Sequence, residues 1–285
     1  MPIPPYVPQN RYFVQVPAHN RQGHTLTGDI RVLAHFHSRY LKTDRDVLVY
    51  LPPGYEQEPH RHYPVLYLQD GQNLFDGATS FIPGQEWRVD ETAESLIHQG
   101  QIEPLIVVAI YNAGKERINE YTPTKDAGIR QGGKARLYGK MLVEELKPLV
   151  DSHYRTKPDA ASTGVGGSSL GGLLSLYLGL TYPKVFGNLA ILSPSIWWNK
   201  RDIVQRFQEL HHKLPLRIWL DTGTNEGGHP DMIIADARNL AHTLETKGWQ
   251  LGHDLAYTEA QGAPHSESAW ATRMPDVLRF LYPAH

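Results

Sequence analysis

The chain has 285 residues, of which 40% are hydrophobic and 20% are charged, a composition typical of a globular protein and not of a disordered one. Its formal net charge of −2 at pH 7 gives no general electrostatic reason to bind nucleic acid or an anionic membrane. The sequence contains no cysteine, which excludes disulfides, thiolate catalysis and cysteine-based zinc sites.

The beginning of the chain predicts an N-terminal surface arm. Residues 1–24 are rich in proline and polar side chains, and one folded domain is expected over residues 25–285. The opening Met1-Pro2-Ile3-Pro4-Pro5 lacks the charged and apolar regions of a signal peptide. No run of about 18 apolar residues is present that could span a membrane. We therefore expect a cytoplasmic protein without a membrane partner.

The first half of the chain predicts four strands and two helices. The expected strands are 30–36, 46–51, 65–68 and 105–110, and the expected helices are 91–99 and 137–150. The strand at 105–110 is continuously apolar, which is typical of a strand covered on both faces. Residues 112–137 contain glycines, prolines and charges without periodicity, so we expect a long loop there, and long loops in compact domains are usually functional.

The second half alternates strands with helices. The expected strands are 161–165, 189–192, 216–220 and 254–257, and the expected helices are 172–180, 202–210, 233–246 and 268–281. This alternation predicts an α/β fold with a mainly parallel sheet and helices on both faces. Ligands of such sheets bind beyond the carboxyl ends of the strands.

A glycine-flanked serine lies between a predicted strand and a predicted helix. Gly167-Ser168-Ser169-Leu170-Gly171 matches the pattern G-x-S-x-G. In this setting the pattern predicts a nucleophile elbow, in which Ser169 occupies a sharp turn that exposes its hydroxyl. A dinucleotide fingerprint starting at Gly164 would need glycine at position 169, and a P-loop would need a Gly-Lys-Ser/Thr ending that is absent.

A serine nucleophile needs a histidine base and a carboxylate that orients it, in the chain order serine, acid, histidine. His265 follows the last predicted strand, whereas His253 precedes that strand and His285 is terminal. The acid should follow the strand 216–220. Glu226 is preferred because its glycine-rich turn can aim a carboxylate back at the histidine, with Asp221 and Asp231 as the alternatives.

Two backbone N–H groups should form an oxyanion hole. The N–H of Leu170 follows the nucleophile, and the N–H of Gln72 lies in the loop after the third predicted strand. Trp197 and Trp198 follow the strand 189–192 and are candidate walls for an aromatic or sugar group. The alternative for either tryptophan is packing beneath the next helix.

A metal-dependent site is the competing interpretation of the polar residues. Its candidate ligands are Asp70, Asp221, Glu226, His229 and Asp231, but they lack a convincing ligand spacing. We therefore expect no metal and no cofactor. The expected partner is a small molecule, and a homo-oligomer is compatible with the sequence.

Several motifs in order resemble an esterase family of the α/β-hydrolase superfamily, the group that includes enterochelin esterases, esterase D and feruloyl or acetyl-xylan esterases. The segments that carry the resemblance are VLVYLPPGY at 47–55, YPVLYLQDGQNLFD at 63–76, NEYTPT at 119–124, EELKPLVDSHYRT at 144–156, GGSSLGGLLSLYLGLTYPKVFG at 166–187 and SPSIWW at 193–198.

This resemblance implies an α/β-hydrolase catalytic domain over residues 25–285, a Ser–acid–His triad and hydrolysis of carboxylic esters without a cofactor. In this family the acid commonly lies in the turn after a Gly-Thr pair, which favours Glu226, although relatives often have aspartate there. The short connection between 192 and 216 leaves no room for a large lid domain, so short or water-soluble esters are the expected substrates. Acyl transfer, feruloyl or acetyl carbohydrate esters and a non-catalytic binding protein are the alternatives.

Overall fold

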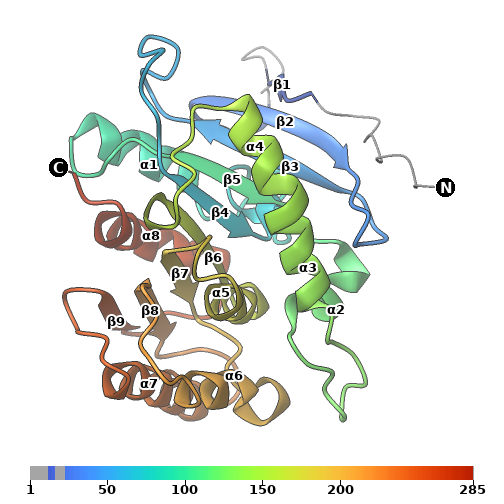
Figure 1. Cartoon of the computed structure of the whole chain (residues 1–285), viewed down its shortest axis with the longest axis vertical. Helices are drawn as coiled ribbons and strands as arrows, with labels where there is room; N and C mark the ends of the chain where they lie inside the picture. Colours follow the sequence, from blue (N-terminus) through green and yellow to red (C-terminus); the bar gives the residue numbers. More distant parts are fainter. Residues whose placement is uncertain (1–11, 17–22, 285) are drawn as a thin grey trace.

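The computed structural model describes residues 12–16 and 23–284. Across these residues a nine-stranded sheet runs through the centre of the molecule (Figure 1), in the order β1-β2-β3-β5-β4-β6-β7-β8-β9. The strands are β1 (Val14–Gln15), β2 (Asp29–Phe36), β3 (Arg45–Leu51), β4 (Val65–Gln69), β5 (Ile106–Ile110), β6 (Thr163–Ser168), β7 (Asn188–Leu192), β8 (Arg217–Gly223) and β9 (Leu255–Ala260).

The sheet is mixed, as its sequence pattern predicts. The first three strands and their junction with β5 are antiparallel, and every pair from β5 to β9 is parallel. The parallel strands therefore end at one edge of the sheet, where ligand sites form in such folds.

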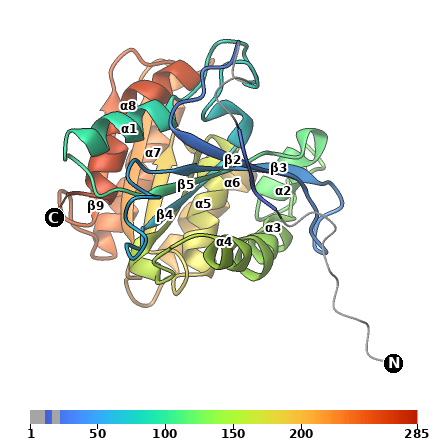
Figure 2. The ribbon, with the colours of Figure 1, turned by 90° about the horizontal axis from the view of Figure 1, so that it is seen from above.

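Helices cover both faces of the sheet (Figures 1 and 2). They are α1 (Val89–His98), α2 (Arg117–Tyr121), α3 (Ala135–Met141), α4 (Lys147–His153), α5 (Leu170–Thr181), α6 (Trp198–Gln208), α7 (Pro230–Thr246) and α8 (Glu267–Leu281). A π-helical stretch, Leu142–Leu146, joins α3 to α4. Side chains of α1 and α8 pack into one apolar cluster, and those of α3 to α7 pack into another on the opposite face.

The alternation of side chains along the central strands builds these two cores. In β4, Val65 and Tyr67 join the cluster beneath α3 to α7, while Leu66 and Leu68 join the cluster beneath α1 and α8. All four side chains are fully buried. Because successive side chains of a strand point to opposite faces, a strand covered on both faces must be apolar throughout.

Three local expectations are corrected by the structure. The segment 112–137 is not a continuous loop, because it contains α2 and a 3₁₀ turn, Gly114–Glu116. The strand expected at 161–165 starts only at Thr163 and extends to Ser168, while Ala160–Ser162 forms a 3₁₀ turn closed by the Asp159 side chain. Most of the predicted arm at 1–24 lies outside the described residues.

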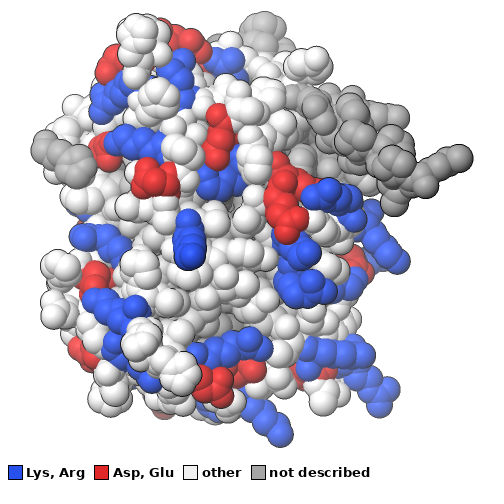
Figure 3. Space-filling view, viewed as in Figure 1, with Lys and Arg blue, Asp and Glu red and all other residues white. Residues whose placement is uncertain are grey.

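Side chains of both charges are mixed on one face of the molecule. On the face seen in Figure 3, Lys and Arg side chains are interspersed with Asp and Glu side chains. Among the described residues, no helix is long and apolar enough to span a membrane. The connection from β7 to β8 contains α6 and short loops, which agrees with the expected absence of a large lid domain.

Candidate active site

Ser169 lies on a strained turn between β6 and α5. Its backbone has φ 56° and ψ −121°, a combination that residues other than glycine rarely adopt. The turn is held because the Ser169 N–H donates to the Leu192 carbonyl at 3.1 Å, and the Ser169 carbonyl accepts from the Ser195 N–H at 2.9 Å. The predicted elbow is therefore present, with α5 beginning at the next residue.

The glycines beside Ser169 allow the strand and helix to approach closely. A Cβ atom at Gly167 would lie 3.0 Å from the Gly171 carbonyl carbon and 3.0 Å from the Gln69 Cβ. Any larger side chain at position 167 would push α5 away from the end of β6. The G-x-S-x-G pattern is thus explained by local packing as well as by backbone conformation.

Glu226 and His265 are brought together from distant segments. Glu226 lies in the turn after β8, and His265 lies between β9 and α8. His265 Nδ1 is 2.9 Å from Glu226 Oε2. The Glu226 side chain is fully buried, whereas that of His265 is 35% exposed. The imidazole also contacts the Trp270 ring edge-on, with the ring centroids 4.9 Å apart.

The surroundings of Glu226 favour its charged form. Burial alone raises the pKa of this carboxyl, but hydrogen bonds from His265, Ser193 and the Gly223 N–H outweigh burial and hold the pKa below its ordinary value. The Gly223 N–H donates to Glu226 Oε1 at 2.6 Å. An ionised Glu226 accepts a hydrogen bond from the N–H of His265 Nδ1, which leaves Nε2 as the hydrogen-bond acceptor of the imidazole.

The two alternative acids are placed elsewhere. Asp221 is fully buried and accepts hydrogen bonds from Arg273 and Trp219, each at 2.8 Å. Burial raises the pKa of Asp221 to about 6, even though Arg273 and Trp219 oppose this effect. Asp231 is exposed in the first turn of α7. Of the three candidates, only Glu226 forms the hydrogen bond to His265.

Ser169 and His265 lie together where two cavities meet. One cavity, of about 290 Å³, includes Phe81 and Ile82 in its lining. The other, of about 250 Å³, includes Trp197 in its lining. Both cavities are lined by Ser169 and His265. A substrate bound at Ser169 can therefore place one group in each cavity.

The two predicted oxyanion donors come from helix starts. Leu170 is the first residue of α5, where N–H groups have no partner within the helix. Gln72 lies in the 3₁₀ turn Gly71–Asn73, ahead of that turn's first hydrogen bond, and lines the same cavity as Ser169. Gly71 is required here because a Cβ would lie 2.7 Å from the backbone of Ala109.

The two adjacent tryptophans have different environments. Trp197 is 46% exposed and lines the smaller cavity. Trp198 is 2% exposed, packs in the core and donates from Nε1 to the Thr124 carbonyl at 2.9 Å. We therefore assign Trp198 to packing rather than to substrate binding, which corrects the expectation for that residue.

The larger of the two cavities also contains an ion pair and a buried carboxyl that were not predicted from the sequence. The Arg117 guanidinium lies against Asp70 through two hydrogen bonds of 2.7 Å, from Nε and Nη2. Burial raises the pKa of Glu267, which accepts from the Asn73 amide at 3.2 Å. Asp70 lies within the motif YLQDGQN and Arg117 lies two residues before NEYTPT, but neither motif indicates that the two side chains meet.

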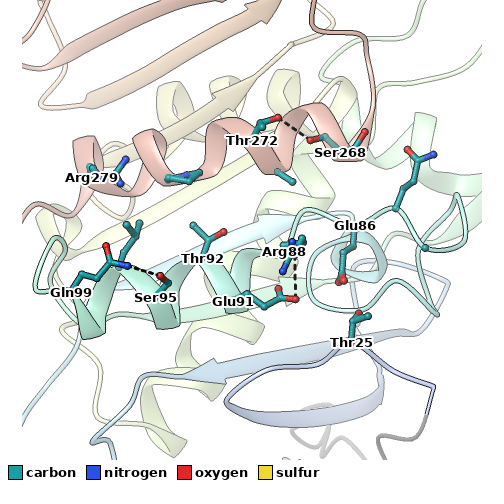
Figure 4. A pocket seen from close by; sticks show the side chains of 15 residues that line it. Thr25, Glu86, Arg88, Glu91, Thr92, Ser95, Gln99, Ser268, Thr272 and Arg279 are labelled. Atoms are coloured by element: carbon teal, nitrogen blue, oxygen red, sulfur yellow. Dashed lines mark hydrogen bonds and ion pairs between the residues drawn. The ribbon is translucent and has the colours of Figure 1, made fainter.

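A still larger cavity lies away from Ser169, in a groove between α1 and α8. It has a volume of about 820 Å³. Figure 4 shows Thr92 and Ser95 on one wall and Ser268 and Thr272 on the other. None of Ser169, Glu226 and His265 lines this groove. The described residues also hold no group of three or more histidine or carboxylate side chains arranged to bind a metal ion.

The mostly parallel sheet, the helices on both faces and the serine at the strand-to-helix turn define an α/β-hydrolase fold. Residues 38–281 match the model of the family described as "Putative esterase", and the chain belongs to this family. It is therefore a carboxylic ester hydrolase.

Named relatives agree with this class. The chain is 29% identical over 246 residues to the ferri-bacillibactin esterase BesA of Bacillus subtilis, covering 79% of this chain and 81% of BesA. It is 34% identical over 154 residues to an endo-1,4-beta-xylanase/feruloyl esterase of Xylanibacter ruminicola, covering 51% of this chain and 19% of that protein. The crystal structure of the BES protein of Bacillus cereus has the same fold, with a TM-score of 0.70, 23% identity and coverage of 90% and 96%.

Proposed function

We propose that the protein is a serine carboxylesterase that hydrolyses short or water-soluble esters through Ser169, His265 and Glu226. The observation that carries this proposal is the hydrogen bond between the buried Glu226 and His265, at the point where His265 and Ser169 line the same two cavities. The nucleophile Ser169, the acid Glu226 and the base His265 then follow the chain order of this fold.

The reaction proceeds in two steps. Ser169 Oγ attacks the ester carbonyl carbon while His265 Nε2 takes the hydroxyl proton. The carbon–oxygen bond to the alcohol then breaks, and His265 returns the proton to the departing alcohol oxygen. Water repeats the sequence on the acyl-enzyme, which releases the acid and restores the Ser169 hydroxyl. Glu226 stays ionised throughout and stabilises the imidazolium.

The negative charge that develops on the carbonyl oxygen is held by backbone donors. We assign this role to the N–H groups of Gln72 and Leu170, which lie at the starts of their helical turns. Removing one donor of this kind typically lowers kcat by about 100- to 1,000-fold. Ser169, His265 and the two N–H groups supply the nucleophile, the base and the oxyanion donors, so the proposed reaction uses no cofactor.

The size and lining of the cavities support compact acyl and alcohol groups. Volumes of about 290 and 250 Å³ lie near the lower limit of drug-sized ligand pockets. Phe81 and Trp197, which are 81% and 46% exposed, each provide an apolar wall to one of the two cavities that Ser169 lines. An aromatic acyl ester is therefore a suitable second substrate class, which includes feruloyl esters.

The test is hydrolysis of p-nitrophenyl esters from acetate to palmitate, together with methyl ferulate, by the wild-type protein and by Ser169→Ala. We expect turnover that is highest for acetate to butyrate and lost in Ser169→Ala. Full ester turnover by Ser169→Ala would overturn the proposal. Addition of alcohol acceptors to the same assay distinguishes hydrolysis from acyl transfer.

A further inference from the structure

Ser193 lies directly behind the proposed catalytic acid. It follows β7, is 2% exposed and has a positive φ of 43°. Its hydroxyl is hydrogen-bonded to Glu226 Oε1, the carboxylate oxygen that does not face His265. The segment SPSIWW contributed to the family resemblance, but nothing in the sequence assigns a task to Ser193.

The direction of this hydrogen bond follows from the other partners of the hydroxyl. Trp270 Nε1 lies 3.0 Å from Ser193 Oγ, and Arg273 Nη2 lies 3.1 Å from it. Indole and guanidinium nitrogens can only donate, and a serine hydroxyl accepts at two lone pairs and donates one proton. Both lone pairs are therefore occupied, so the single proton of Ser193 is directed to Glu226.

A buried ion pair keeps these donors in place. Arg273 Nη1 donates to Asp221 Oδ1 at 2.8 Å, and the two side chains are 7% and 0% exposed. Asp221 also fixes Ser193, whose N–H lies 3.2 Å from Asp221 Oδ1 and 3.0 Å from the Asp221 carbonyl oxygen. The same aspartate therefore holds both the backbone of Ser193 and the arginine that donates to its hydroxyl.

We infer that Ser193 is a positioning residue for the triad, because its hydroxyl, oriented by Trp270 and Arg273, fixes the carboxylate of Glu226 against His265. This inference rests on the proposed triad. With Oε1 held by Ser193 and the Gly223 N–H, Oε2 is left to accept from His265 Nδ1. The imidazole is thereby kept in the tautomer whose Nε2 can take the proton of Ser169.

The first test is Ser193→Ala, assayed with p-nitrophenyl acetate. We expect kcat to fall by about 10- to 100-fold, the range that a hydrogen bond to a charged group spans. KM should change by less than kcat, because Ser193 is only 2% exposed where it borders the smaller cavity. The downfield proton resonance of the His265–Glu226 hydrogen bond should shift or broaden. Ser193→Thr, which keeps the hydroxyl, should recover part of kcat.

The matched control is Ser38→Ala. Ser38 is 3% exposed, and its hydroxyl donates to a carboxylate oxygen of Glu145 at 2.5 Å, but it lies outside the site. This variant loses a comparable buried hydrogen bond and should keep the wild-type kcat and the downfield resonance. A common loss of activity in both serine variants would reduce Ser193 to a structural role and overturn the inference.

A second variant tests whether the donors to the Ser193 hydroxyl orient it. Trp270→Phe keeps an aromatic ring beside His265 but removes the N–H that occupies a lone pair of Ser193. We expect a several-fold fall in kcat that disappears when Ser193 is already alanine, because the two residues act through one hydroxyl. Additive effects in the double variant would contradict the inference. If Ser193→Ala keeps full kcat while Ser169→Ala is inactive, the positioning role fails and the proposed function stands.

Discussion

Replacing Glu226 with glutamine tests how the acid controls the histidine. Glu226 Oε1 accepts from the Gly223 N–H and from the Ser193 hydroxyl. Both partners donate, so a glutamine must place its carbonyl oxygen at this position. Its NH₂ group then faces His265 Nδ1. An NH₂ group can only donate, so it forces Nδ1 to accept and moves the imidazole proton to Nε2.

The resulting tautomer cannot take the proton of Ser169. In serine proteases the equivalent change lowers kcat by about 10⁴-fold, which corresponds to about 5 kcal/mol of transition-state stabilisation at 1.36 kcal/mol per tenfold change. We expect a loss of this order for Glu226→Gln.

The assay is p-nitrophenyl acetate hydrolysis, with circular dichroism to confirm that the variant is folded. Glu226→Asp is the control, because it keeps the charge and the tautomer and should retain more activity than Glu226→Gln. A folded Glu226→Gln protein with kcat within tenfold of the wild-type value would refute the reasoning about the tautomer. In that case Asp221 would have to be reconsidered as the acid.

Three further predictions follow from buried and exposed side chains. Burial raises the pKa of Asp90 to about 9, so between about pH 4 and pH 9 the folded protein keeps a proton that the unfolded chain has lost. The free energy of unfolding then falls by up to about 1.4 kcal/mol per pH unit as the pH rises. Asp90→Asn should remove this slope, measured by urea unfolding at pH 6, 7 and 8. If the free energy of unfolding changes with pH equally in the two proteins, the prediction is contradicted. Trp197→Ala should raise KM for methyl ferulate about fivefold with little change in kcat, since a ring contact contributes about 1 kcal/mol; an unchanged KM would exclude Trp197 as a wall. Trp198→Ala should instead lower the free energy of unfolding by about 3–5 kcal/mol, measured by urea titration, whereas a stability change below about 1 kcal/mol would contradict its core position.

Most predicted elements that depend on local sequence agree with the structure, apart from the loop expected at 112–137 and the start of the strand expected at 161–165. The elbow at Ser169 could be predicted because its glycines, strand and helix are adjacent in the chain. Glu226 and His265 could be proposed because parallel strands end at one edge of the sheet, and each residue follows such a strand. The two residues are 39 positions apart in the sequence, and predicting that they meet required only the order of the strands.

Contacts that depend on side-chain packing could not be predicted in this way. The donors to Ser193 come from Trp270 and Arg273, which are 77 and 80 residues away. Both residues lie in α8, on the face of the sheet that α1 also covers. The opposite environments of Trp197 and Trp198 depend on how α6 begins. Because the two tryptophans are adjacent and of the same residue type, the local sequence does not distinguish them. Their different roles follow only from the packing of the folded chain.

The most direct measurement of the central claim is labelling with a fluorophosphonate probe, followed by mass spectrometry of the proteolytic peptides. Only an activated serine reacts, so the account predicts a single adduct on Ser169. That adduct should be absent in Ser169→Ala and should form much more slowly in Glu226→Gln. Ester hydrolysis without labelling, or an adduct on another serine, would contradict the assignment of Ser169 as the nucleophile.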